Sequence, residues 1–180
     1  LSRSQVAQAG YGVTKRSGFL ADPYKLRDVR PDQRLEHRVS LGYLQYFEQW
    51  GARLKAEYRY FWDSFDIKAH TTSVSLFKSL GQDWDVEPRL RWYEQSEASF
   101  FALGDRYDLP LTVAQSSDAR LSSFGAWSTG FSINYTRDVM KVGLSYDRYV
   151  SEPSAGIGSP SGHRALMRYE LLSLGVRFRL

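Results

Sequence analysis

The sequence predicts an all-β fold, an antiparallel, up-and-down transmembrane β-barrel with eight strands in this chain. Three observations predict it: alternation of apolar and polar side chains, connections that are long and short in turn, and a high content of aromatic residues. In Ala52–Trp62 the even positions are apolar or aromatic, and the odd positions from Arg53 to Arg59 are charged. Successive side chains of a strand point to opposite faces, so one face is apolar and the other charged. A long apolar face with charge turned inward is typical of a strand crossing an outer membrane.

The composition fits a barrel and argues against other classes of membrane segment. The 180 residues fit a single domain, residues 1–180. The mean hydropathy is −0.45 and no run of eighteen apolar residues exists, which excludes a transmembrane helix but not a barrel wall. Aromatic residues form 15% of the chain, which fits the girdles of aromatic side chains at membrane interfaces. Without cysteine, disulfides and thiolate sites are excluded.

The net charge of +4 and the isoelectric point near 9.3 could indicate a nucleic-acid partner. However, lysine and arginine are spread along the whole chain, and many fall on strand faces opposite apolar ones. We therefore expect no nucleic-acid partner.

Alternation and turn signals place the first four strands. Ser4–Lys15 alternates, and its glycines permit close packing. Ser17–Arg34 is polar with two prolines, so we expect a long loop. Leu35–Phe47 is the second strand, and a tight turn connects it to the third, Ala52–Trp62. The fourth, Lys68–Leu80, carries small serine and threonine side chains on its polar face.

The remaining four strands follow the same rule. Trp84–Gln95 nearly repeats the pattern of the third strand, although Pro88 cannot donate to the sheet and indicates a local bulge. The long loop Ser96–Ser117 leads to the sixth strand, Leu121–Tyr135. The last three elements are a strand, a long loop and a final strand: Met140–Tyr149, Ser151–Arg164 and Ala165–Leu180.

The lengths of the connections predict an orientation. They are long after the first, fifth and seventh strands and short after the second, fourth and sixth, as in barrels with short periplasmic turns and longer external loops. Alternating apolar residues up to Leu180 resemble the signal by which such barrels are recognised for insertion. We therefore expect the bacterial outer membrane as the location. The expected partners are membrane lipids and lipopolysaccharide, with other outer-membrane or periplasmic proteins as candidates.

Three segments resemble a family of uncharacterised Gram-negative outer-membrane β-barrel proteins, a domain of unknown function: 17–24 (SGFLADPY), 58–63 (YRYFWD) and 88–95 (PRLRWYEQ). The resemblance implies an integral outer-membrane protein and supplies no activity, cofactor or catalytic residue. Members of this family look longer than this chain. The chain is therefore expected to be either a complete barrel or the C-terminal portion of a larger one.

The candidate functional residues are the charged side chains on the strand face that we expect to point into the barrel, which we call the inward series. There they would line a lumen. They are Arg38, Arg53, Lys55, Glu57, Arg59, Asp85, Glu87, Arg89, Arg91, Lys141, Asp147, Arg177 and Arg179. With Glu36, the inward series has nine basic and five acidic residues.

Two interpretations of this set stay open. An eight-stranded barrel is just wide enough for its side chains to fill, so ion pairs between the third and fifth strands, across the small fourth, would plug it. A wider wall would leave a passive pore whose excess of arginine favours small anions. A structural module that binds other envelope proteins is a further alternative.

An enzyme is the less favoured interpretation. His37 and His70 fall near Asp63 and Asp66 at the expected outer rim, where acid–base chemistry or a metal site is geometrically feasible. Both histidines, however, belong to the outward series, and no hydrolase or metalloprotease motif is present. We expect no enzyme, no cofactor and no metal. A soluble ligand-binding barrel would have an apolar interior, the reverse of the pattern at Arg53–Arg59.

Overall fold

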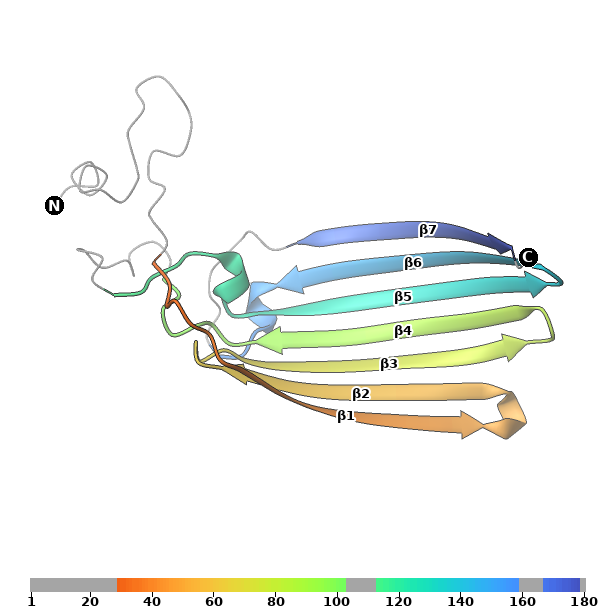
Figure 1. Ribbon diagram of the computed structural model, residues 1–180, viewed down its shortest axis with the longest axis horizontal. Helices are drawn as coiled ribbons and strands as arrows, with labels where there is room; N and C mark the ends of the chain where they lie inside the picture. The colour runs from red at the N-terminus through yellow and green to blue at the C-terminus, as the bar shows by residue number, and fades with distance from the viewer. Residues whose placement is uncertain (1–28, 103–112, 159–166, 179–180) are drawn as a thin grey trace, which may run out of the picture.

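The computed structural model describes residues 29–102, 113–158 and 167–178 (Figure 1). Within these ranges the protein is all-β, with one sheet in which each strand pairs antiparallel with the next along the chain. The strands are β1 (Glu36–Phe47), β2 (Ala52–Asp63), β3 (Lys68–Leu80), β4 (Trp84–Gln95), β5 (Phe124–Arg137), β6 (Met140–Glu152) and β7 (Arg168–Phe178). Three single-turn 3-10 helices accompany them in the described part of the chain: η1 (Glu48–Trp50), η3 (Ala119–Leu121) and η4 (Pro153–Ala155). Among the described residues, no helix has the length and apolar character needed to cross a membrane.

The all-β, up-and-down arrangement is confirmed, and the second to eighth predicted strands correspond to β1–β7. The first predicted strand, Ser4–Lys15, lies outside the described residues. Closure into an eight-stranded barrel is not observed: the described sheet is open, with seven strands and β1 and β7 at its edges. The physical reason that the sheet stays open is the direction of its two edge strands. Both edge strands are odd-numbered in a meander and run the same way (Figure 1), so they cannot pair antiparallel with each other.

The strand register is uniform, which corrects one expectation. Pro88 causes no bulge, because the register of β4 with β3 is the same on both sides of it, and Pro88 itself pairs with Phe131 of β5. Pairing with β3 is interrupted only at Leu76 and Phe77. A proline lacks one N–H, so it removes a ladder hydrogen bond toward one neighbour and leaves the other intact. Gly51 and Gly81, with φ of 54° and 71°, supply the left-handed residues of two turns.

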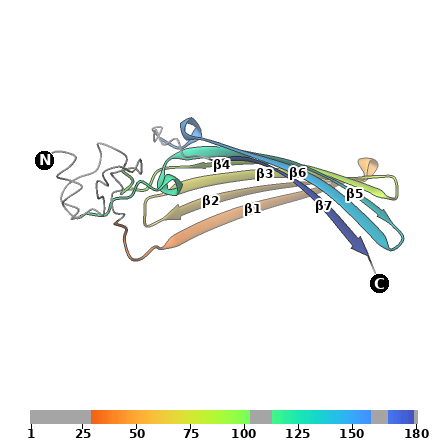
Figure 2. The ribbon, with the colours of Figure 1, turned by 90° about the horizontal axis from the view of Figure 1, so that it is seen from above.

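The sheet is curved, and its two faces differ in chemistry. Figure 2 shows both edge strands lying on the same side of the central strands, so the sheet forms a trough. The predicted charged face is the hollow one, because a cavity of about 570 Å³ on that face is lined by residues from β2 to β7. The opposite face is convex and exposes apolar side chains, among them Leu41 (67% exposed), Leu90 (45%) and Leu174 (71%).

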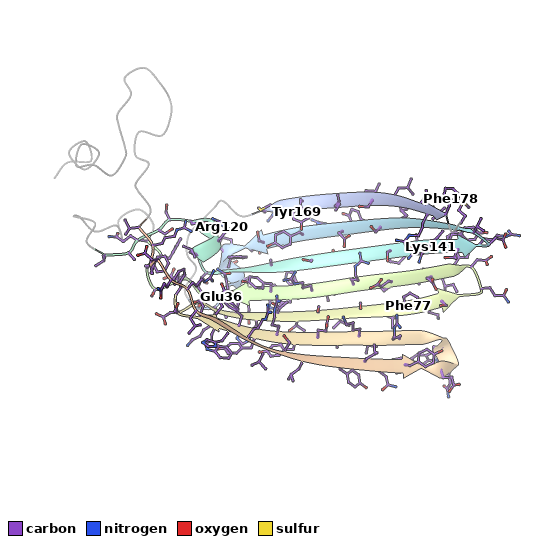
Figure 3. All side chains as sticks on the ribbon, viewed as in Figure 1. Glu36, Phe77, Arg120, Lys141, Tyr169 and Phe178 are labelled. Atoms are coloured by element: carbon purple, nitrogen blue, oxygen red, sulfur yellow. The ribbon has the colours of Figure 1, made fainter. Side chains whose placement is uncertain are left out.

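The buried core lies at one end of the sheet rather than between layers. Phe65, Ile67, Ala98, Phe101 and Leu121 form a cluster with exposed fractions of 7% or less, in the connections that follow β2 and β4. This end carries Glu36 and Arg120, and the opposite end, where the short turns lie, carries Lys141 and Phe178 (Figure 3). We call the two ends the loop end and the turn end. The predicted sixth strand began at Leu121, but this residue ends η3 and packs into the cluster.

Candidate functional site

The strand register assembles the predicted lumen residues on one face. On β2, Arg59 pairs with Thr71 of β3, which pairs with Tyr93 of β4. Because side chains alternate, every second residue of each strand follows the same face across the sheet. Twelve of the thirteen predicted lumen residues lie on this face, which we call the charged face. The thirteenth, Arg179, lies outside the described residues.

Arg89 is the centre of the main polar network on the charged face. Its guanidinium donates to Asp147 Oδ1 at 3.0 Å and to Ser132 Oγ at 3.2 Å, and its Nη1 lies 3.7 Å from Glu87 Oε2. The ion pair therefore joins β4 to β6 across β5. It passes over Gly130, where an added Cβ would collide with the Asp147 carboxylate. A glycine at this position is what lets the arginine reach the acid.

The predicted ion pairs between the third and fifth predicted strands, now β2 and β4, do not occur among the described residues. Lys55 instead pairs with Glu57 of its own strand at 3.0 Å. Arg53 lies over the ring of Phe77, with 5.0 Å from its Cζ to the ring centroid. Five other basic residues of the charged face form no salt bridge within the described ranges: Arg38, Arg59, Arg91, Lys141 and Arg177.

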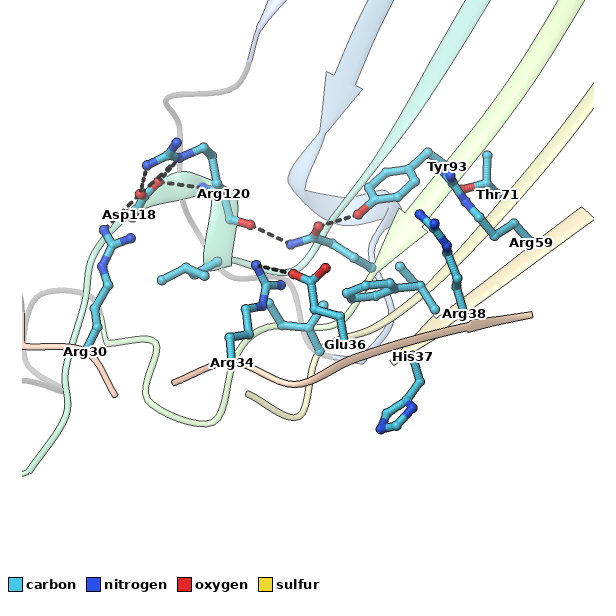
Figure 4. Close-up of a pocket in the computed structure, with 15 residues that line it drawn as sticks. Arg30, Arg34, Glu36, His37, Arg38, Arg59, Thr71, Tyr93, Asp118 and Arg120 are labelled. Atoms are coloured by element: carbon cyan, nitrogen blue, oxygen red, sulfur yellow. Dashed lines mark hydrogen bonds and ion pairs between the residues drawn. The ribbon is translucent and has the colours of Figure 1, made fainter. Parts of the chain in front are cut away.

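A second cavity, of about 730 Å³, lies at the loop end of the charged face (Figure 4). We call it the rim cavity. Its walls come from β1, β2, β3, β4, the segment before β1 and η3. The arginines that line it are Arg30, Arg34, Arg38, Arg59 and Arg120, and the acids are Glu36 and Asp118. The cavity is therefore predominantly basic.

Asp118 joins two of these arginines. Arg30 donates to its Oδ2 at 3.0 Å and Arg120 at 2.6 Å, and the Arg120 backbone N–H donates to its Oδ1 at 2.9 Å. The hydrogen bonds from the Arg120 side chain are the largest cause that holds the pKa of Asp118 far below its usual value. Asp118 thus fixes the loop after β4 against the segment before β1.

Arg34 binds two acids: its Nε donates to Asp63 Oδ2 at 2.8 Å, and its guanidinium also lies 3.1 Å from Glu36 Oε1. The Asp63 side chain is fully buried and accepts hydrogen bonds from the backbone N–H groups of Phe65 and Ile67, both at 2.9 Å. Because these bonds span the turn between β2 and β3, Asp63 stabilises that turn. Arg34 neutralises the buried charge of the Asp63 carboxylate. Sequence reasoning missed Arg30 and Arg34 as site residues, since they lie in a segment without periodicity.

The two histidines considered for acid–base chemistry or a metal site lie on the convex face. His37 stacks on Trp62 with ring centroids 5.2 Å apart, and Figure 4 shows its side chain pointing away from the rim cavity. His70 Nδ1 lies 2.6 Å from the Tyr58 hydroxyl. In the part of the chain that the structure describes, no group of three metal-ligating side chains is present. The geometry gives these histidines aromatic partners rather than Asp63 or Asp66.

Replacing Arg34 tests the buried carboxylate. In Arg34→Ala, Asp63 keeps only its backbone donors, so we expect the free energy of unfolding to fall by about 2–3 kcal/mol. Lys55→Ala, which removes the cation of the exposed pair with Glu57, is the control and should cost less than about 1 kcal/mol. Urea unfolding of both variants provides the comparison, and equal losses would contradict the assigned role of Asp63.

Asp118 should make stability depend on pH in the acid range. Its pKa is lowered in the folded state, so its contribution is fully present above the unfolded value of about 3.9 and is lost as the pH falls through the lower folded value. Asp118→Asn cannot ionise. The difference in unfolding free energy between the wild type and this variant should therefore be constant near about pH 7 and shrink below about pH 4. A difference that stays the same throughout acid unfolding titrations would refute this coupling.

Comparisons with known proteins give one match. The family model described as "protein of unknown function (DUF3570)" matches residues 1–169. No curated protein and no solved structure matches the chain. The predicted resemblance to an uncharacterised family is confirmed to this extent, while the outer-membrane location stays a prediction. On a match that covers nearly its whole length, the chain belongs to the DUF3570 family.

Proposed function

We propose that the chain forms part of the wall of a β-barrel in the bacterial outer membrane. This barrel is a passive pore that favours small anions. In this proposal the convex face contacts membrane lipid and lipopolysaccharide, and the charged face lines a hydrated lumen. The observation that carries it is the separation of the two faces: exposed apolar side chains on the convex side, and basic residues without acidic partners in the described part of the hollow side.

The apolar face supports the membrane part of the proposal. Leu41, Leu90, Leu144 and Leu174 come from four strands, and each is at least 43% exposed. An exposed apolar surface that runs across a whole sheet is far larger than soluble monomers usually carry, and marks contact with a membrane or a partner. Lipid is the simpler partner, because the face is apolar along the length of several strands.

Aromatic pairs mark both ends of this face. Trp92 lies against Trp127 toward the loop end, and Trp84 lies against Tyr135 toward the turn end, with centroids 4.2 and 4.7 Å apart. The pairs are separated by eight residues of β4, about 27 Å along the strand. A strand tilt of about 40° reduces this to about 20 Å, close to the apolar band of about 25 Å between the aromatic girdles of outer-membrane barrels.

The excess of positive charge supports the pore and its preference. Unneutralised arginines raise the potential along a lumen and concentrate anions there. The alternative, a plugged barrel with a structural or partner-binding role, is favoured by the Arg89–Asp147–Ser132 network, which already occupies the centre of the charged face. The two differ in whether ions pass.

The membrane assignment predicts an unusual response at Leu90, an exposed side chain near the middle of β4. In a soluble protein, Leu90→Arg at such a site would change stability by less than about 0.5 kcal/mol. Facing lipid between the midplane and the loop-end aromatic pair, it should cost about 1–3 kcal/mol. Ser73→Arg on the charged face is the matched control and should be tolerated. Unfolding in detergent micelles or bilayers measures both, and a neutral Leu90→Arg would contradict lipid contact.

The pore predicts anion-selective current. The full-length gene product in planar bilayers should give conductance steps with anion preference, and Arg91→Gln should weaken that preference because it removes a cation from the charged face. Arg148→Gln removes the same charge from the convex face, where Arg148 lies 3.7 Å from Glu170, and should leave selectivity unchanged. Absence of current would favour the plugged barrel, and equal effects of both variants would contradict the assignment of the faces.

A further inference from the structure

Two cations in the rim cavity have no acidic partner among the described residues. Of its five arginines, Arg30 and Arg120 bind Asp118, and Arg34 binds Asp63 and Glu36. For Arg38 and Arg59, by contrast, the described part of the chain provides no salt bridge. They are diagonal neighbours, since Arg38 pairs in register with Phe61, two residues from Arg59. Two like charges this close repel each other, and an anion between them would remove that repulsion.

A buried hydroxyl lies beside these arginines. Thr71 is the direct cross-strand partner of Arg59, lines the rim cavity and is only 8% exposed. Among the described residues, no hydrogen bond of its hydroxyl is present, which is unusual for a buried polar group. Figure 4 shows Arg38 and Arg59 both extending toward Thr71 and Tyr93. The cavity thus gathers two guanidinium groups and a hydroxyl donor for which the described residues provide no acceptor.

We propose that the rim cavity binds a soluble phosphate monoester, with Arg38 and Arg59 contacting the phosphate oxygens and Thr71 donating from its hydroxyl. Guanidinium groups match phosphate oxygens with paired N–H donors. Donors that come from three strands suit a tetrahedral dianion better than one planar carboxylate. The volume of about 730 Å³ and the ring of Phe61 in the wall leave room for the organic group of the ester. The inference deepens the proposed function, since the site would lie at one mouth of the lumen.

Binding to the purified full chain in detergent micelles tests the site. Inorganic phosphate and glycerol 3-phosphate are titrated calorimetrically at low ionic strength, and the ester should bind more tightly. Arg38→Gln and Arg59→Gln should each weaken binding about tenfold or more, because each removes a charged hydrogen-bond donor. Thr71→Val should weaken it by a smaller factor. Arg53→Gln is the matched control: it lies on the same face of the same strand as Arg59, about 20 Å away, and should change affinity less than about twofold.

Several results would overturn the site. They are no binding of either probe by the wild type, equal weakening by Arg53→Gln, or competition by phosphatidylglycerol added to the micelles, which would assign the cavity to lipid headgroups. Arg38→Lys keeps the charge and should fold as the wild type does, yet bind more weakly because the paired donors are lost. Conductance is measured separately. Phosphate binding without current would overturn the proposed pore and support this site. Current without phosphate binding would support the pore and overturn this site.

Discussion

The unshifted register of the antiparallel ladder is the constraint on which the charged face depends. Each strand pairs with the next without a change of register, even where Pro88 interrupts the hydrogen bonds to β3. Because side chains alternate with a period of two, a one-residue slip in any pairing would move every later charge to the convex face. The hairpin turns hold this register. The charged face is therefore a property of the whole sheet and not of one strand.

Small residues decide where charge on this face is neutralised. Gly130 of β5 lets Arg89 reach Asp147 on the next strand, so charge is paired there. The equivalent positions of β3 carry hydroxyl side chains, but the charged residues on either side do not form ion pairs across them in the described structure. Arg59 therefore lies beside Thr71 on the neighbouring strand, whereas Arg89 forms an ion pair with Asp147. The surplus of positive charge results from where acids are placed. Arg38, Arg59 and Arg91 lie in the half toward the loop end, and Lys141 and Arg177 lie at the turn end.

The strands and their faces could be predicted because alternation is a local signal. A period of two is visible within each segment, and it placed twelve of the predicted lumen residues on one shared face. The rim cavity could not be predicted in the same way. The contact of Arg34 with Asp63 joins residues 29 positions apart, and that of Arg30 with Asp118 joins residues 88 apart. Such contacts depend on how aperiodic connections fold back on the sheet, for which the sequence carries no periodic signal. Leu121 was misplaced for the same reason, since its apolar side chain fits a strand pattern equally well.

The direction of the edge strands limits how the proposed barrel can close. Since β1 and β7 run the same way, an all-antiparallel wall needs an odd number of further strands between them. A single added strand gives eight, and an interior that side chains fill. In so narrow a lumen, Arg38, Arg59 and Arg91 would lose water without gaining an acid from the described residues, which is costly. More strands widen the barrel and keep these cations hydrated. Within this proposal, the arginines that have no acidic partner among the described residues therefore favour a wall of more than eight strands, and with it the pore over the plug.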